Sequence, residues 1–536
     1  MQSAAHADVA ILGGGLAGLT LALQLRARFP QLDVLVLERR RHPVPEAAHK
    51  VGESSVEIAA HYFDTVLGLK EHMTTRQLKK FGFRFFFSDG REDIDQVAEL
   101  GASRYLATPS YQIDRGIFEN HLAEVAQSQG VRFLDGSTVD EVFLDDHGAH
   151  HEIRYRSAGA SHAVSARWLI DASGREGIVK RRLGLAEANA HDANAIWFRI
   201  GTRIDVNDWS SDRAWLDRCD PPYRWLSTNH LVGEGYWAWL IPLSSGSHSV
   251  GIVCDAKLHP LRTMNTYAKA MDWFRKHQPR LARALEDKEH LLQDFIALRR
   301  FSYGCRQVFS GSRWALTGEA GVFLDPFYSP GGDFIAIGNT YITELIAKDL
   351  AGEPIEHLAR IYERFYLSFY ESTLTLYVDQ YPMFGDAEVM PVKVIWDYTY
   401  YWGVLCQLFF QHRLTDLAML GRVRREMTAA MALNAAMQRF LREWSRVSAK
   451  RNAAVMLDQA RLEWFAELNR GLRDALDDEA FRERLRETTT QLRDLAREIV
   501  ERAVEQHPAL DAAGVLALLA GAAAPPAPAS MLFEAA

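Results

Sequence analysis

Three glycines near the N-terminus, Gly13, Gly15 and Gly18, have the spacing of a turn that binds a dinucleotide. Glycine allows the backbone to turn sharply and to approach a pyrophosphate, and the amide groups that open the following helix then receive the anion. Glu38 lies about twenty residues further on, where an acidic side chain accepts a hydrogen bond from a ribose hydroxyl. The pattern predicts dinucleotide binding, and a purely structural glycine-rich turn is the alternative.

The residues around this turn have the apolar periodicity of a strand, a helix and a second strand. The run 8–12 predicts a short buried strand, 19–28 a helix and 33–38 the next strand, which ends in the acidic residue. This order predicts an α/β fold with a Rossmann-like nucleotide-binding domain.

The rest of the chain changes in composition along its length. Short strand-like runs and turns fill about 40–340, which predicts a sheet-bearing substrate domain interleaved with the nucleotide-binding domain. From about Thr340 onward Leu, Ala, Arg and Glu recur at helical spacing, which predicts a helical C-terminal region. We therefore expect an interleaved unit over 1–345, helices over 346–520 and a flexible tail over 521–536.

Composition narrows the class of protein. The 536 residues are 48% hydrophobic and 24% charged, as in soluble globular proteins and unlike disordered or polytopic membrane proteins. The net charge of −8 does not attract nucleic acid. Four widely spaced cysteines predict neither a disulfide framework nor a zinc site, and the N-terminus lacks the basic segment of a secretory signal. We expect a cytoplasmic protein with no metal and no transmembrane segment.

Four further motifs lie between residues 114 and 326. They are Asp114-Arg115, the strand end Asp171-Ala172-Ser173-Gly174, the pair Gly318-Glu319, and Asp325-Pro326. Together with the glycine turn, they resemble the aromatic-hydroxylase type of FAD-dependent monooxygenase. The resemblance implies that FAD is the cofactor, that these motifs bind it, and that Arg115 touches it. It also implies that Glu319 binds the ribityl chain, in a position where this family usually has Asp.

Two more motifs narrow the resemblance. Trp237 and Trp239 lie in a run of the form Trp-x-Trp-x-Ile-Pro, and Lys80 opens a Lys-x-Gly-x-x-Phe element after the loop 51–55. Both are similar to elements of flavin-dependent halogenases, in the branch that acts on phenols and pyrroles. The resemblance implies that the tryptophans lie near the flavin and that Lys80 is the catalytic lysine. Lys79 is adjacent, and in a strand it would point the opposite way; two merely buried indoles are the alternative for the tryptophans.

The segment after Asp325-Pro326 departs from the tryptophan halogenases, which have Glu-Ser-Thr-Gly there. The resemblance implies that Tyr328 replaces the glutamate that assists proton removal from indole, whereas Ser329 is retained. Pro330 has no N–H, so the resemblance places halide at the amide groups of Gly331 and Gly332. We expect a phenolic substrate rather than free tryptophan, because a phenolate supplies its own electrons and needs less help from a base.

The resemblance implies halogenation that depends on FADH2 and O2. A separate flavin reductase supplies FADH2, chloride or bromide becomes hypohalous acid, and Lys80 directs this acid to an electron-rich aromatic of phenolic or aryl-polyene type. The substrate is either a small molecule or bound to a carrier protein. Two alternatives stay open: an FAD-dependent monooxygenase or dehydrogenase without halogenating activity, which Pro330 and Gly332 favour, and a non-catalytic flavoprotein that binds a partner.

Aromatic residues are abundant, with 13 Trp, 18 Tyr and 27 Phe. One cluster at helical spacing consists of Trp396, Tyr398, Tyr400, Tyr401 and Trp402. It is interpreted either as core packing or as the wall of an aromatic substrate pocket. The later residues 413–505 are nearly free of Gly and Pro, which predicts several packed helices.

Overall fold

The computed structural model describes residues 5–47, 49–145, 150–520 and 532, so most of the expected tail lies outside the described residues. Its contacts divide the chain into two compact units, each built from three segments. Unit 1 comprises 1–77, 113–190 and 302–371; unit 2 comprises 78–112, 191–301 and 372–536. The two units are defined by contacts between residues. The domain bounds expected from composition, 1–345, 346–520 and 521–536, stay a prediction.

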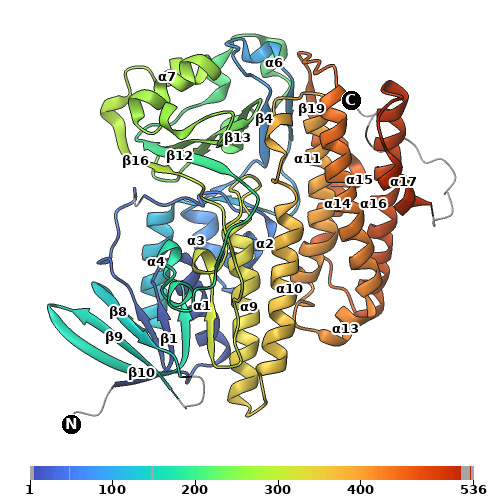
Figure 1. Ribbon diagram of the computed structural model, residues 1–536. Coiled ribbons are helices and arrows are strands. Elements are labelled where there is room, and N and C mark those ends of the chain that lie inside the picture. Colours follow the sequence, from blue (N-terminus) through green and yellow to red (C-terminus); the bar gives the residue numbers. More distant parts are fainter. Residues whose placement is uncertain (1–4, 48, 146–149, 521–531, 533–536) are drawn as a thin grey trace. The chain divides into compact units, whose positions relative to one another are not determined.

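Unit 1 is built on a seven-stranded sheet with a parallel centre. Its parallel strands are β7 (Arg132–Leu134), β2 (Val34–Leu37), β1 (Ala5–Leu12), β10 (Ala160–Asp171) and β18 (Trp314–Leu316). The strands β8 (Ser137–Phe143) and β9 (His151–Ser157) continue the sheet in antiparallel fashion and form a ribbon with β10 (Figure 1).

Helices cover this sheet, as its apolar central strands require. Residues 9–12 and every residue of β2 are buried, because parallel strands are covered on both faces. The helices of unit 1 include α1 (Leu16–Arg28), α2 (Glu57–His61), α4 (Arg115–Ser128), α9 (Gly331–Leu350) and α10 (Glu356–Leu374) up to residue 371. The predicted α/β fold is confirmed, and the strand–helix–strand order at the N-terminus is the predicted one.

Unit 2 contains an eight-stranded mixed sheet. Its order is β16 (Leu292–Leu298), β12 (Ala193–Ile200), β15 (His248–Asp255), β14 (Tyr236–Pro242), β13 (Thr228–Gly233), β4 (Phe83–Phe86), β5 (Glu99–Gly101) and β19 (Met456–Asp458). On one face Phe198, Ala238 and Ile252 join a core that α7 (Tyr267–His277) helps to form. Because side chains alternate along a strand, Trp237 and Trp239 lie on the other face.

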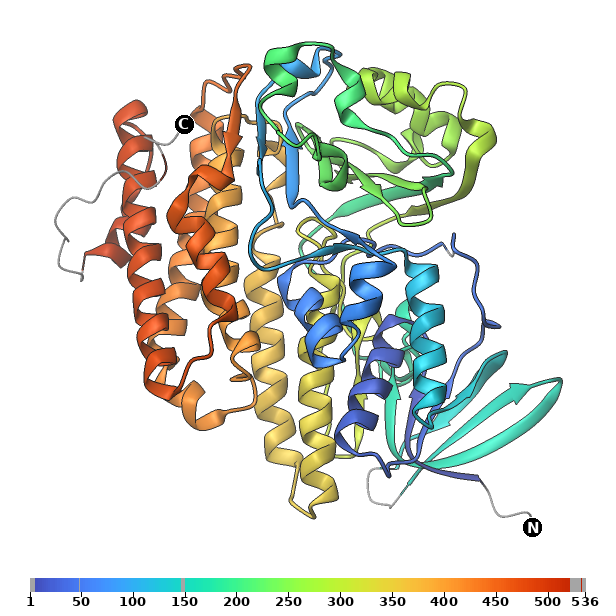
Figure 2. The ribbon, with the colours of Figure 1, turned by 180° about the vertical axis from the view of Figure 1, so that it is seen from behind.

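The last segment of unit 2, from residue 372 onward, is mostly helical. Its helices are α11 (Val389–Tyr400), a π-helical turn η10 (Tyr401–Cys406), α12 (Gln407–Phe410), α13 (Leu417–Arg422), α14 (Arg424–Val447), α15 (Glu463–Arg470), α16 (Asp478–Gln506) and α17 (Ala513–Leu519). Several lie side by side in both ribbon views (Figures 1 and 2). The helices expected over 413–505 are present, although β19 interrupts them and pairs with β5. In the described part of the chain, no helix is long and apolar enough to cross a membrane.

A buried charge cluster fixes one end of the sheet in unit 2. The Glu99 carboxylate on β5 accepts hydrogen bonds from Arg84 on β4 and from Arg224 Nε, the latter at 2.8 Å. All three side chains are fully buried, and the Arg224 guanidinium lies 4.1 Å from the ring centre of Trp215. Arg84 thereby holds β4 in place, and with it the phenylalanines on either side of Arg84.

Candidate functional site

The predicted dinucleotide turn connects β1 to α1 and requires glycine at two of its positions. A Cβ on Gly13 would lie 2.4 Å from the Ala172 carbonyl oxygen, and a Cβ on Gly18 would lie 2.0 Å from the Gly13 carbonyl oxygen. A Cβ on Gly15 would meet nothing within 4 Å. Gly15 precedes the first turn of α1, whose amide groups have no partner within the helix. The turn therefore leaves open space at the positive end of a helix.

Glu38 lies beside this turn, at the end of β2. Its Oε2 accepts a hydrogen bond from Gly14 N at 2.7 Å, and its Oε1 accepts one from Arg40 N at 2.8 Å. Each carboxylate oxygen can accept a second hydrogen bond, so Glu38 retains the capacity to bind a ribose hydroxyl. The structure thus brings together the three glycines and the acid that the sequence pattern predicts.

Asp171, at the end of β10, is adjacent to the turn but its carboxylate holds the backbone. Oδ1 accepts hydrogen bonds from the amide and hydroxyl of Ser173, and Oδ2 accepts one from Val179 N at 2.7 Å. Burial raises the pKa of Asp171. These contacts shape the loop after β10, so Asp171 positions the backbone next to the predicted cofactor site.

Arg115, at the start of α4, has an unusual set of contacts. Its Nη1 donates to the Val51 carbonyl at 2.6 Å and its Nη2 donates to Glu119, but Nε is buried with no partner among the described residues. Burial lowers its pKa to about 10, against the opposing effect of the Glu319 and Glu53 carboxylates. A buried cationic donor with an unused N–H fits an oxygen-rich anionic ligand such as FAD.

Glu319 has a partner that the sequence motifs do not include. Its Oε2 lies 3.0 Å from Arg175 Nε, and the Arg175 guanidinium lies 4.7 Å from the ring centre of Phe323. The sequence offers one signal for Arg175: it directly follows the Asp171–Gly174 motif. Gly318 has a φ of 61°, and a Cβ there would lie 2.9 Å from Ala17 Cβ, which brings this loop against α1. FAD bound here would interact with Glu319 in competition with Arg175.

The predicted halide-binding segment begins α9. Tyr328 and Ser329 have φ values of 66° and 55°, a left-handed conformation that is costly for side chains other than glycine. Ser329 N donates to the Pro326 carbonyl at 2.8 Å, and Asp325 Oδ1 accepts from Phe327 N, so this turn is held on both sides. Pro330 then caps the helix.

The first amide groups of α9 belong to Gly331 and Gly332, and a helix leaves such groups without intrahelical partners. A Cβ on Gly331 would meet nothing within 4 Å, whereas a Cβ on Gly332 would lie 2.7 Å from Ala59 Cβ in α2. The two glycines thus lie at the positive end of a 20-residue helix, with open space beside the first. An anion such as halide is favoured at this position.

The remaining predicted site residues, Lys80, Trp237 and Trp239, belong to unit 2. Trp237 Nε1 donates to the Tyr381 hydroxyl at 2.9 Å, and Trp239 Nε1 donates to Ser249 Oγ at 3.0 Å. The Trp239 ring lies flat against Gly251, where a Cβ would approach Cζ2 to 2.2 Å. Both indoles are therefore held in fixed positions on the sheet face opposite the core.

The two adjacent lysines lie in different surroundings. Lys80 is 3% exposed, and its Nζ lies 3.4 Å from the ring centre of Phe83, a cation–π contact. Lys79 ends the short strand β3 (Leu78–Lys79), is exposed, and its Nζ lies 4.4 Å from the ring centre of Tyr105. Backbone alternation thus separates a buried ammonium from an exposed one.

His230 on β13 connects Lys80 to the tryptophans, and the sequence contained no signal for it. Its ring stacks on Phe85 at 4.5 Å and lies 5.2 Å from Phe83 and 5.3 Å from Trp237. His230 Nδ1 lies 3.1 Å from the Arg84 carbonyl oxygen, which can only accept, so Nδ1 carries the proton. Burial, with a contribution from the Lys80 charge, lowers the His230 pKa to about 3, and the ring is neutral. The rings of Phe83, Phe85, His230 and Trp237 therefore form one aromatic layer, and the Lys80 ammonium lies on its Phe83 ring.

The aromatic cluster around residue 400 divides into two parts. Trp396 Nε1 donates to Asn434 Oδ1 at 3.0 Å and packs in the interior. Tyr398 lies 5.9 Å from Phe83 and 4.7 Å from Trp402, measured between ring centres. The first part is core, whereas the second reaches the ring that contacts Lys80.

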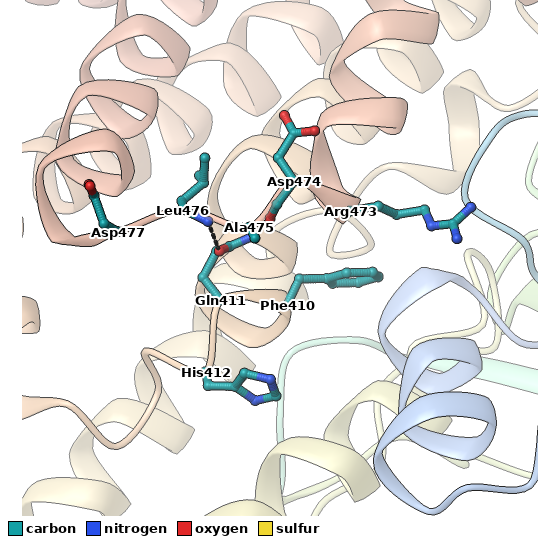
Figure 3. A pocket seen from close by; sticks show the side chains of 8 residues that line it. All are labelled: Phe410, Gln411, His412, Arg473, Asp474, Ala475, Leu476 and Asp477. Atoms are coloured by element: carbon teal, nitrogen blue, oxygen red, sulfur yellow. Dashed lines mark hydrogen bonds between the residues drawn. The ribbon is translucent and has the colours of Figure 1, made fainter.

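A surface pocket of about 500 Å³ lies nearby in the chain (Figure 3). It is lined by Phe410, Gln411, His412, Arg473, Asp474, Ala475, Leu476 and Asp477. Gln411 Nε2 donates to the Asp474 carbonyl at 2.7 Å, and its Oε1 accepts from Leu476 N at 3.1 Å. This pocket contains none of the predicted site residues, and both ends of the Gln411 side-chain amide are hydrogen-bonded.

The sequence of this chain is similar to those of known flavoproteins. A family model described as an FAD binding domain matches residues 6–258. The chain is 25% identical to the flavin-dependent halogenase chlA of Dictyostelium discoideum over 77% of this chain and 74% of that protein. It is 26% identical to a 1H-pyrrole-2-carbonyl peptidyl-carrier protein brominase of Pseudoalteromonas luteoviolacea, over 61% of this chain and 74% of that protein.

Solved structures show the same fold. The halogenase PltM superposes with a TM-score of 0.64 at 19% identity, covering 92% of this chain and 96% of that chain. The flavin-dependent halogenase CmlS superposes with a TM-score of 0.55 at 22% identity, covering 77% and 66%. These comparisons confirm the Rossmann-like FAD-binding fold and FAD as the cofactor.

The glycine turn allows a test of cofactor binding that is separate from folding. Gly15→Ala is expected to fold normally, because its Cβ meets nothing, yet to bind FAD on the order of tenfold more weakly, because the methyl group keeps the pyrophosphate away. Gly18→Ala is expected not to fold stably, since its Cβ collides with the backbone. Thermal melting and titration with FAD measure both effects. Equal FAD affinity of Gly15→Ala and wild type would contradict the assignment.

Proposed function

We propose that this chain, an FAD-dependent oxidoreductase related to the flavin-dependent halogenases, halogenates an electron-rich aromatic substrate with Lys80 as the directing residue. The observation that carries the proposal is the buried Lys80 ammonium on the face of Phe83, in the same aromatic layer as Trp237. A structural lysine is ordinarily exposed, as Lys79 is. An ammonium held among rings has a defined position from which it can orient a reagent.

The residues of unit 1 would hold the cofactor and the halide. The glycine turn, Glu38 and Arg115 would hold FAD, which in its reduced form supplies with O2 the oxidising power that converts halide into hypohalous acid. The start of α9 at Gly331 and Gly332 would hold chloride or bromide. The left-handed turn at Tyr328 and Ser329 fixes where that helix begins.

Lys80 would act on the hypohalous acid. Its ammonium donates a hydrogen bond to this acid and orients the halogen toward the aromatic ring, and the surrounding rings exclude water that would otherwise carry the acid away. The neutral His230 adds no second charge to this environment. The substrate class is a phenolic or aryl-polyene-type ring, whose own electrons drive substitution without a strong base.

The partners follow from this chemistry. A separate flavin reductase would supply FADH2, and the substrate would arrive either free or bound to a carrier protein, as in the brominase relative named for a carrier-bound pyrrole. The proposed location is the cytoplasm.

The test is an assay with purified protein, enzymatically supplied FADH2, O2, sodium bromide and a panel of phenols. We expect brominated products, identified by mass spectrometry from the paired bromine isotopes. Products that are hydroxylated and never brominated would show that the protein is instead a monooxygenase. Stable FAD binding without any product would favour a non-catalytic flavoprotein.

A further inference from the structure

The Lys80 ammonium lies on a ring that resists halogenation. Its Nζ is 3.4 Å from the ring centre of Phe83, and Phe85 continues the same face of β4. A phenyl ring has no hydroxyl group or ring nitrogen to donate electrons, so an electrophilic halogen attacks it far more slowly than a phenol or an indole. Hypohalous acid held at Lys80 therefore has a contact surface that it does not consume.

One phenol adjoins this Phe83 ring. The ring centre of Tyr398, on α11, lies 5.9 Å from that of Phe83, with the two ring planes inclined at 46°. Tyr398 is 9% exposed, so reagents in bulk solvent have little access to it. A phenol is also the kind of ring that the proposed function halogenates in the substrate. The chain thus carries a ring of the substrate's own chemical class next to the ring on which Lys80 lies.

Within unit 2, the other electron-rich rings are further from Phe83 along the ring contacts. Trp237 is connected to Phe83 through His230, with ring centres 5.2 Å apart in the first contact and 5.3 Å apart in the second. Trp402 lies 4.7 Å from Tyr398 and is thus one ring beyond it. His230 takes up halogen first on a ring nitrogen, in a labile bond that passes the halogen on. Tyr398 is therefore the first ring of unit 2 on which halogen forms a lasting bond to carbon.

We propose that Tyr398 is a self-modification site: when substrate is absent, hypohalous acid held at Lys80 halogenates the ring carbon next to the Tyr398 hydroxyl. The step is an electrophilic substitution. A carbon–halogen bond forms, the halogen–oxygen bond of the acid breaks, and the displaced ring proton leaves with the hydroxide as water, so no further oxidant or reductant is consumed. The self-modification rests on the proposed function, because that reaction supplies the acid.

A halogen atom on Tyr398 would disturb the surroundings of Lys80. The Tyr398 ring packs against Phe83 on one side and against Trp402 and Phe465 on others. Extra volume in a packed interior displaces neighbouring side chains. A displaced Phe83 would carry the Lys80 ammonium out of position. Turnover without substrate is therefore expected to inactivate the protein, one molecule for each modified Tyr398.

Two other tyrosines of unit 2 provide controls. Tyr400 lies two residues further along α11, is also 9% exposed, and shares a hydrogen bond with Ser372 Oγ at 2.8 Å. In the described part of the chain it has no ring contact with Phe83, since residues two apart on a helix point in nearly opposite directions. Tyr223 is 37% exposed and reports acid that has escaped into solvent.

The first measurement locates the label. The full chain is supplied with FADH2, O2 and sodium bromide, without substrate and with excess free methionine to destroy escaped acid. Peptide mass spectrometry is expected to show the paired bromine isotopes at Tyr398, at least about tenfold above Tyr400, because the acid is held nearby. Tyr223 is expected to be labelled only when methionine is left out. Lys80→Met is expected to lose the label at Tyr398, and a phenol that the protein brominates is expected to suppress it.

The second measurement follows the loss of activity. Wild type is incubated with FADH2, O2 and bromide until half of its activity towards a phenol is lost, and Tyr398→Phe is expected to keep most of its own initial activity under the same conditions. Tyr400→Phe is expected to lose activity as wild type does.

Three results would overturn the assignment of Tyr398. They are equal label at Tyr398 and Tyr400, label at Trp237 or Tyr328 in place of Tyr398, and an unmodified Tyr398 in a protein that brominates added phenols. The last of these would leave the proposed function intact. Absence of bromine from both the protein and every added phenol would instead contradict the proposed function, and the self-modification with it.

Discussion

Lys80→Met is expected to slow product formation by about 10²–10⁴-fold, the range by which a positioned proton donor accelerates a reaction. The methionine side chain retains the length and apolar contacts of lysine next to Phe83 but cannot donate a hydrogen bond to hypohalous acid. Flavin oxidation by O2 does not require this side chain, so oxygen uptake is expected to continue at the wild-type rate. Product formation is followed by chromatography with mass spectrometry, and oxygen uptake with an electrode.

Lys79→Met is the matched control for this experiment. The two lysines are adjacent, but Lys79 is exposed and contacts only the ring of Tyr105 among the cation–π pairs of the described residues. We expect Lys79→Met to halogenate at the wild-type rate. Retention of full activity by Lys80→Met, or an equal loss in both variants, would exclude Lys80 as the directing residue.

Glu99→Ala is expected to lower the free energy of unfolding by about 3–5 kcal/mol, because it leaves two buried guanidinium groups without their carboxylate. Arg84 and Arg224 are fully buried, and neither can lose its proton to relieve the charge. The effect is measured by urea denaturation, followed by tryptophan fluorescence. We also expect weaker substrate halogenation, since Arg84 lies between Phe83 and Phe85 on β4.

An exposed ion pair in the same unit provides the comparison. Glu443 pairs with Arg446 at 2.6 Å on α14, where both side chains are largely exposed to solvent. Glu443→Ala is expected to change the free energy of unfolding by less than about 1 kcal/mol. Similar losses for Glu99→Ala and Glu443→Ala would show that the buried triad does not hold the sheet.

Local patterns were sufficient to predict the parts of the site that depend on the backbone. The glycine spacing at 13–18 predicted a turn in which two of the glycines have no room for a side chain. The predicted difference between Lys79 and Lys80 agrees with their burial, although β3 ends at Lys79 and Lys80 lies just beyond it. At Gly18 the determining contact is local, with the Gly13 carbonyl oxygen, and Lys80 contacts Phe83 three residues further on.

Other features depend on residues far apart in the sequence and could not be predicted. The strand β19 interrupts an otherwise helical stretch because it pairs with β5. It could not be predicted from local sequence, since β5 lies more than 350 residues earlier. His230 is a lone histidine in a strand, and only the fold places it between Phe85 and Trp237. The pairing of Glu319 with Arg175 likewise arises from tertiary packing.

The alternation of the chain between its two units has a consequence for protein synthesis. Unit 1 cannot be completed until residue 371 has been translated, because α9 and α10 belong to it, and the first segments of unit 2 have emerged long before then. Those early segments include β4 and β5, whose partner β19 is made last. The edge of β5 that pairs with β19 therefore stays unpaired for most of translation, and unpaired strand edges favour aggregation. We expect that neither unit can be produced alone by truncating the gene at a single point.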